Sequence, residues 1–226
     1  MRAILYSGNL RTFEYCAQNH ADVLGECDVY FALSDEWGYI DRINGPWHSL
    51  MPNRREGKVT EGDVRKLTPS CFNIKEISIK PTFPLLHALK LKQNNNLIYQ
   101  YLKMKECFDL LREEYDEIIR MRCDITIERV KFRKGLTCNK NIWYSQTKQN
   151  FVKKHVQQWM DKQMNEMVFT GGYKVMEKAC RVFDNLDELN ELLPKAKQYG
   201  ESVFFHHLRL EGINPWLFNF KYRVKR

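Results

Sequence analysis

Two arginines and an aspartate interrupt an otherwise apolar stretch in the middle of the chain. Residues 118–127 read IIRMRCDITI, with Arg120, Arg122 and Asp124 at every second position. Side chains of a β-strand point alternately to opposite faces, so these three share one face and the apolar residues between them share the other. Burying unpaired charge is costly. The row therefore indicates either an exposed stripe in which arginine and aspartate pair, or a pocket whose ligand needs the charges.

The types of these residues suit the binding of a diphosphate. A carboxylate at the end of a strand can hold a divalent cation, which prefers oxygen ligands. The cation would bridge to the diphosphate, and the neighbouring arginines would offset the remaining phosphate charge. His206 is a candidate second metal ligand. It precedes His207 on an expected helix, where adjacent side chains point about 100° apart, and a purely structural histidine is the other interpretation.

A second candidate binding segment follows the first expected strand. The stretch SGNLR at residues 7–11 comes directly after RAILY and before a helical pattern. Ligands of open α/β sheets bind beyond the carboxyl ends of the strands, and backbone N–H groups at a helix start suit a phosphate, here with Arg11 alongside. No G-x-G-x-x-G motif or Walker lysine is present, so an ordinary strand-to-helix turn is the alternative.

Two carboxylates are candidates for proton transfer. Glu201 opens the expected helix of ESVFFHHLR, and Glu166 precedes the expected strand MVFTGG. Either could act as a general base or orient an acceptor. A purely structural role at a helix start is the alternative for Glu201, because a carboxylate there stabilises the helix dipole.

The elements that must position these residues alternate between strands and helices. A strand at 2–6, a helix and a strand at 27–34 predict a parallel βαβ unit. Further strands are expected at 72–80, 118–127, 141–146 and 167–172, with helices at about 95–114, from about 173, and at about 201–211. Residues 35–70 are polar and irregular. The pattern predicts one α/β domain over 1–226, with a mixed, mostly parallel, Rossmann-like central sheet flanked by helices.

Composition narrows the choice of partner and compartment. The chain has 36 Lys and Arg against 28 Asp and Glu, a net charge of +8, which favours an anionic partner: nucleic acid, a membrane surface or a phosphorylated small molecule. The basic stretches KFRK and KYRVKR lack the aromatic spacing of an RNA-binding motif, so we expect no nucleic acid. No apolar run approaches the roughly 20 residues that span a bilayer.

The cysteines point to a reducing compartment. There are seven, an odd number without C-x-x-C spacing, and no secretory signal precedes them, which argues against a disulfide framework or a zinc site. We expect a cytoplasmic protein.

Four segments in order resemble a family of small GT-A glycosyltransferases from bacterial surface-polysaccharide clusters and large DNA viruses. SGNLRTF is similar to the family's SGQ-x-RTF, and YDEIIRMRCD to its YD-x-x-IR-x-R-x-D. NEMVFTGG resembles ND-x-F-x-x-G, with Glu166 in place of an aspartate, and ESVFFHHL resembles a helix opened by an acidic residue. The resemblance implies a GT-A-like fold. It also implies transfer of a sugar from a nucleotide-diphosphate donor to a hydroxyl of a glycan acceptor.

The resemblance also implies roles for individual residues. The donor would contact Ser7, Gly8, Asn9, Arg11, Arg120, Arg122 and Asp124. Asp124 matches the metal-binding acid of D-x-D, with Mn²⁺ or Mg²⁺ as cofactor, but Arg122 stands where the first acid would be. Gly171 and Gly172 would leave room for the sugar or the acceptor. For an inverting enzyme Glu201 would be the preferred base, with Glu166 as its rival. The nucleotide-binding half would be about 1–127 and the acceptor half about 128–226; a viral member would work in the host cytoplasm.

Two other functions remain open at this point. The charge of +8 also fits a non-catalytic module that binds nucleic acid or another anionic polymer. A different nucleotide-dependent α/β enzyme, such as a phosphotransferase, is the third hypothesis, and the missing Walker and kinase signatures weigh against it.

Overall fold

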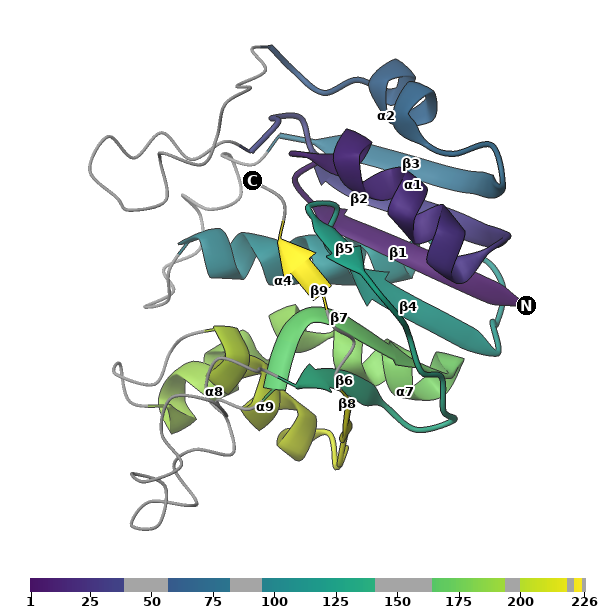
Figure 1. Ribbon diagram of the computed structural model, residues 1–226. Coiled ribbons are helices and arrows are strands. Elements are labelled where there is room, and N and C mark those ends of the chain that lie inside the picture. The colour runs from purple at the N-terminus through teal and green to yellow at the C-terminus, as the bar shows by residue number, and fades with distance from the viewer. Residues whose placement is uncertain (39–56, 82–94, 141–163, 194–199, 219–221, 225–226) are drawn as a thin grey trace, which may run out of the picture.

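Seven strands form one mixed, mostly parallel sheet in the computed structural model (Figure 1). The structure describes residues 1–38, 57–81, 95–140, 164–193, 200–218 and 222–224. The strand order is β3-β2-β1-β4-β7-β6-β8. The first four of these strands run parallel to one another, whereas β7 is antiparallel to both β4 and β6. The α/β architecture that the sequence predicts is confirmed.

The parallel half begins with the predicted βαβ unit. It consists of β1 (Arg2–Gly8), α1 (Phe13–Leu24) and β2 (Cys27–Ser34). β1 lies in the middle of the sheet with helices on both sides, and Ala3 to Ser7 are all buried. A strand covered on both faces is continuously apolar, which explains the run AILY. β3 (Phe72–Lys80) confirms the third predicted strand.

Helices pack on both faces of the sheet, and each face has its own hydrophobic core. One core contains side chains of α4 (Asn95–Asp109), α7 (Tyr173–Cys180), α8 (Leu186–Leu192) and α9 (Gly200–Leu210), with the short 3-10 helix Val182–Asn185 among them. The other contains side chains of α1 and α2 (Glu61–Leu67). The buried stripe predicted on α4 is confirmed by Tyr101, Met104 and Phe108, but α4 ends at Asp109, earlier than expected.

The predicted strand 118–127 is wrong as a single strand, although its two faces are right. β4 (Glu117–Met121) contains Arg120 but ends before Arg122 and Asp124, and β5 (Ile125–Ile127) leaves the large sheet to pair with β9 (Tyr222–Val224). The interruption between β4 and β5 contains Asp124, whose carboxylate accepts hydrogen bonds from Arg122 and Arg11. The apolar residues of the alternating set nevertheless all enter the core beside α1: Ile119, Met121, Cys123, Ile125 and Ile127.

Part of the stretch expected to be irregular is a helix. α2 begins with a capping box, in which the side chains of Thr60 and Asp63 each accept a hydrogen bond from the other residue's backbone N–H. Such a box satisfies two otherwise unpaired donors, and the pattern T-x-x-D was the signal that could have predicted it. The strand expected at 141–146 lies outside the described residues.

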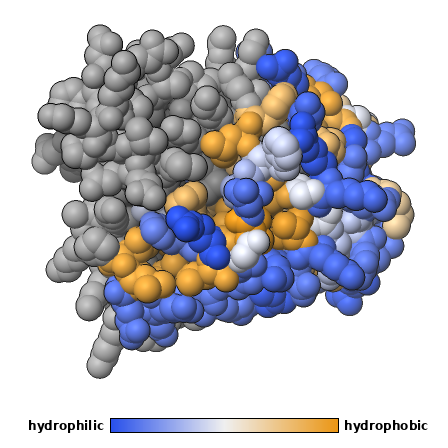
Figure 2. Space-filling model, turned by 90° about the horizontal axis from the view of Figure 1, so that it is seen from below, coloured by the Kyte–Doolittle hydropathy of each residue, from blue (hydrophilic) through white to orange (hydrophobic). Residues whose placement is uncertain are grey.

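The antiparallel end of the sheet carries an apolar surface. It is built from β7 (Met164–Gly171), β6 (Thr137–Lys140) and β8 (Trp216–Phe218). Trp216 and Leu217 on β8, and Leu210 at the end of α9, are exposed. Figure 2, which views the molecule from below, shows hydrophobic residues across the middle of the described part of this face and hydrophilic residues below and to the right of them. Among the helices of the described ranges, none has the length and apolar character to cross a membrane.

Candidate donor-binding site

The two candidate segments lie where the direction of the sheet's growth reverses. From β1 the chain moves outward to β2 and β3, and then α4 returns it to β4 on the other side of β1 (Figure 1). The crevice beyond the carboxyl ends of such strands is the usual ligand site of open α/β sheets. Residues 7–11 span the end of β1 and the turn after it, and residues 120–124 span the end of β4 and the turn after it, so the fold brings both segments to this point.

Asp124 is the centre of a buried ion-pair cluster. The guanidinium of Arg122 donates from Nε to Oδ1 (2.8 Å) and from Nη2 to Oδ2 (2.5 Å) of Asp124. Arg11 donates from Nη1 to the same Oδ2 at 2.8 Å. The side chain of Asp124 is 1% exposed, against 22% for Arg11 and 16% for Arg122. The row is therefore not an exposed stripe, and its charges meet the turn after β1.

The electrostatics of the cluster favour ionised Asp124. Burial alone would raise the pKa of this carboxyl group, but the guanidinium groups of Arg122 and Arg11 outweigh burial and hold the pKa well below its usual range. For Arg122, burial opposes the charge and Asp124 restores it, so the pKa of Arg122 is raised. All three groups are charged near neutral pH.

A second buried arginine joins β1, β4 and β7. Arg120 is fully buried, and its Nε donates to Oγ of Ser7 at 3.0 Å while its Nη1 donates to the backbone carbonyl of Glu166. The third nitrogen, Nη2, has no hydrogen-bond partner among the described residues. The same holds for Oε2 of Glu166, whose Oε1 accepts from Gln100 Nε2 at 3.4 Å. A ligand hydroxyl, which both accepts and donates, could satisfy either atom.

The turn after β1 is held in an unusual backbone conformation. Gly8 has φ 112° and Arg11 has φ 46°, and Arg11 is the one residue other than glycine with positive φ in the described ranges. The N–H of Arg11 donates to the carbonyl of Trp37 at 3.0 Å. Strained residues of this kind cluster at ligand sites. In this conformation the Arg11 side chain reaches Asp124.

Close packing fixes this turn against the end of β2. A Cβ atom added to Gly38 would lie 2.2 Å from Cβ of Asn9, so only glycine fits beside that side chain. Asn9 also donates from Nδ2 to the carbonyl of Glu36 at 3.3 Å. The sequence analysis missed Gly38, which carried no signal beyond being one glycine of an irregular stretch.

The segment after Asp124 is fastened to α1. Asn19 forms two bonds with the backbone of Ile127, accepting from its N–H (2.7 Å) and donating to its carbonyl (3.0 Å). Buried His20 lies between the hydroxyl of Tyr6 (2.9 Å) and the carbonyl of Ile125 (2.5 Å). These contacts orient β5 and therefore Asp124. The sequence analysis missed both residues, and only their place on the buried face of a helix could have indicated them.

The two glycines proposed for the acceptor lie at the other end of the sheet. Because β7 is antiparallel to β4, Gly171 lies beside Ile118 at the start of β4, and a Cβ on Gly172 would be 3.6 Å from the carbonyl oxygen of Asp116. A Cβ on Gly171 would be 2.6 Å from Val175 Cγ1, so packing against α7 already requires its small size. The structure does not bring this pair to Asp124, whereas Glu166, at the other end of β7, is there.

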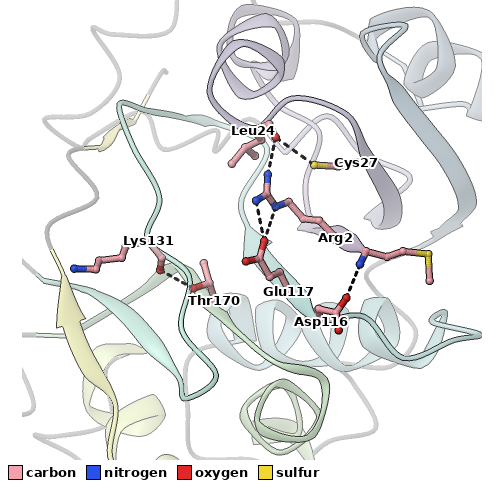
Figure 3. Close-up of polar contacts among 8 residues, drawn as sticks. Arg2, Leu24, Cys27, Asp116, Glu117, Lys131 and Thr170 are labelled. Atoms are coloured by element: carbon pink, nitrogen blue, oxygen red, sulfur yellow. Dashed lines mark hydrogen bonds and ion pairs between the residues drawn. The ribbon is translucent and has the colours of Figure 1, made fainter.

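Figure 3 shows how this opposite end is held together. Arg2 on β1 donates from Nε and Nη2 to one carboxylate oxygen of Glu117 on β4 (3.0 and 2.8 Å) and from Nη1 to the carbonyl of Leu24. The terminal amine bonds to Asp116 at 2.6 Å. Because these charges are paired with one another, they stabilise the strand pair β1–β4. We therefore expect a ligand site at the carboxyl ends of these two strands instead.

The two expected metal ligands, Asp124 and His206, belong to no group of three or more possible metal ligands in the described part of the chain. Both oxygens of Asp124 are already bonded to arginine. His206 packs edge-on against Phe205 on α9. His207 is buried and bonds to the carbonyl of Lys178, a structural role. The side chain of Glu201 lies outside the described part of the structure.

No protein-family model matches this chain, and no curated protein matches it. The resemblance to small glycosyltransferases therefore stays a prediction, and the arguments for function come from the geometry of the cluster.

Proposed function

We propose that this protein is a glycosyltransferase that moves a sugar from a nucleotide-diphosphate donor to a hydroxyl of a glycan acceptor. The observation that carries the proposal is the buried cluster of Arg11, Arg122 and Asp124 at the switch point between β1 and β4. A departing nucleoside diphosphate gains negative charge in the transition state. Cationic groups held in place before the reaction stabilise that charge most effectively, and Asp124 holds both guanidinium groups in place.

The acceptor side of the reaction is assigned to Glu166. Its carboxylate has one oxygen without a partner among the described residues, and its charge acts on buried Arg120, whose Nη2 also lacks one. A carboxylate in this position can accept the proton of an attacking hydroxyl or fix the hydroxyl's orientation. Glu201, the base that the family resemblance favoured, follows the first residue of α9 and becomes the second candidate, because its side chain lies outside the described part of the structure. The proposal covers both an inverting and a retaining course.

A thermal-shift screen with UDP, GDP, ADP, CDP, dTDP and their common sugar conjugates tests the proposal. A ligand at about 100 times its Kd stabilises the fold by about 2.7 kcal/mol. For a chain of this size that corresponds to a rise in Tm of about 5 to 10 °C. We expect such a rise with at least one diphosphate, and a smaller one with the matching monophosphate, because the cluster is assigned to the diphosphate.

The matched variants are Arg11→Gln and Arg112→Gln. Arg112 pairs with Glu76 far from the cluster and is 81% exposed, so its variant should keep the full shift. Arg11→Gln removes one of the two cations at Asp124 and should weaken diphosphate binding by about tenfold or more, as the loss of a charge-assisted phosphate contact does. If no diphosphate or nucleotide sugar raises Tm, or if Arg11→Gln binds as tightly as the unaltered protein, the proposal is wrong.

A further inference from the structure

We infer that Asp124 is the fixed counter-ion of Arg11 and Arg122 rather than a metal ligand, and that the donor's diphosphate binds to these arginines without a divalent cation. The inference rests on the proposed function and concerns the same site. It replaces the Mn²⁺ or Mg²⁺ that the family resemblance implied.

The first argument is the occupancy of the Asp124 carboxylate. Arg122 contacts both oxygens in the two-pronged geometry that matches a guanidinium to a carboxylate, and Arg11 adds a third bond to Oδ2. These three bonds take three of the roughly four lone-pair sites of the carboxylate, so a divalent cation that needs more than the remaining site on Oδ1 must displace an arginine. A displaced guanidinium group would be left without its counter-ion, in a place where all three side chains are mostly buried.

The second argument is the scarcity of other oxygen ligands. Mg²⁺ requires six ligands in octahedral geometry and usually keeps one or two protein carboxylates among them. Asp124 supplies one carboxylate, and the described ranges offer no group of three His, Cys, Asp or Glu residues around it or elsewhere. In a D-x-D motif the other aspartate would supply a ligand, but Arg122 occupies that position and binds Asp124 itself.

The third argument is the charge of the site. Arg11 and Arg122 pair with Asp124, and the charge of Glu166 acts on Arg120 and Arg122. These five side chains together carry one positive charge in excess, and Nη2 of buried Arg120 has no hydrogen-bond partner among the described residues. A further divalent cation would add to this excess, whereas the negative diphosphate would neutralise it.

The arginines can take over what a metal does in this chemistry. A cation next to the diphosphate attracts the negative charge that develops on the leaving oxygen as the bond from the sugar carbon to that oxygen breaks. The guanidinium ion is always charged and presents several donors in a plane, which suits the oxygens of a phosphate. Because Asp124 fixes the position of both groups, they need no reorganisation when the donor binds.

The test is calorimetric titration with the diphosphate that gives the largest thermal shift among UDP, GDP, ADP, CDP and dTDP. One titration contains EDTA and the other contains Mn²⁺ in excess. We expect affinities that agree within about threefold, since no coordination to the protein is added. Mn²⁺ alone, followed by its electron paramagnetic resonance signal, should not bind to the unaltered protein.

Two variants assign the charge role. Arg122→Gln and the milder Arg11→Gln should each weaken diphosphate binding by about tenfold or more in EDTA. Excess Mn²⁺ should restore neither, and the exposed-site variant Arg112→Gln should bind normally. Measuring both site variants keeps the test valid if Arg122→Gln fails to fold.

The outcomes separate this inference from the proposed function. Diphosphate binding that requires Mn²⁺, or is about tenfold or more tighter with it, overturns the inference and leaves the proposed function standing. No diphosphate binding under either condition overturns both. Binding in EDTA that disappears in the arginine variants supports both.

Discussion

At the scale of single residues, the protein relies on buried polar groups that are each held by several partners. Asp124 is held by two arginines, Arg120 by Ser7 and the Glu166 carbonyl, and His20 by Tyr6 and the Ile125 carbonyl. Buried polar groups cost free energy unless they are bonded. These residues therefore define one arrangement of the loop after β4, because any other arrangement leaves buried charges unpaired.

His20 makes the stability of this arrangement depend on pH. Burial lowers the pKa of His20 from 6.5 to about 4, although the bond to the Ile125 carbonyl acts in the opposite direction. In the unfolded chain the histidine binds its proton below about pH 6.5, while in the folded protein it does so only near pH 4. The contribution is therefore present above pH 6.5 and is lost as the pH falls to 4, amounting to about 3 kcal/mol.

Urea denaturation of the unaltered protein and of His20→Phe between pH 7 and pH 4 tests this prediction. The free energy of unfolding of the unaltered protein should fall more steeply than that of the variant, because the variant has no imidazole to protonate. Carboxylates titrate in both proteins and cancel in the difference. Parallel pH profiles of the two proteins would contradict the prediction.

At the scale of elements, the site depends on how closely two turns approach each other. The turn after β1 lies against the segment after β2, where the space for a Cβ atom on Gly38 is taken by Asn9. Gly25, at the end of α1, also has positive φ, but a Cβ atom there would meet nothing within 4 Å. Both glycines therefore have positive φ, but only at Gly38 would a Cβ atom collide with a neighbouring side chain.

The variants Gly25→Ala and Gly38→Ala separate these two effects. Gly25→Ala should cost roughly 1–2 kcal/mol, the penalty of left-handed backbone for an L-residue, and leave diphosphate binding unchanged. Gly38→Ala should be more destabilising and should weaken diphosphate binding, because the new methyl group displaces Asn9 and with it the turn that positions Arg11. Thermal unfolding and calorimetric titration measure both effects. Equal binding by the two variants would show that the turn does not position the site.

At the scale of the whole molecule, the net charge of +8 gathers only in part at the site. Many cations are elsewhere, as in the pairing of Arg2 with Glu117 and of Arg112 with Glu76. Arg133 lies over the ring of Trp216, and Arg2 also lies over that of Phe132. In the part of the chain that the structure describes, the charge is thus distributed over several elements rather than concentrated in one stripe of the kind that tracks a nucleic-acid backbone.

The dependence of binding on salt distinguishes a compact site from such a stripe. A protein that contacts 6 to 10 phosphates of a duplex loses about 10³ to 10⁵ in affinity between about 50 and 200 mM salt. A site for one diphosphate involves few charges, so we expect its affinity to fall by about tenfold over the same range. Fluorescence anisotropy with a labelled oligonucleotide provides the comparison. Tight, steeply salt-dependent oligonucleotide binding that no diphosphate displaces would favour the polymer-binding alternative.

The sequence by itself determined the βαβ start, the buried stripe of α4, and the division of residues 118–127 into an apolar and a charged face. These features follow from the spacing of apolar residues along the chain, which can be read from the sequence without knowing the fold. It did not determine where β4 stops, because that depends on bonds from Arg11, more than a hundred residues away.

Only the tertiary structure decided which residues meet. Because β7 is antiparallel to β4, Glu166 lies at the same end of the sheet as Asp124, and Gly171 and Gly172 lie at the opposite end. The direction of a strand within a sheet cannot be read from the pattern of residues in that strand. The pairing of Arg11 and Arg122 with one carboxylate likewise joins segments distant in the chain. The sequence gives the charge of each side chain, but only the packing of the folded chain determines which opposite charge it pairs with.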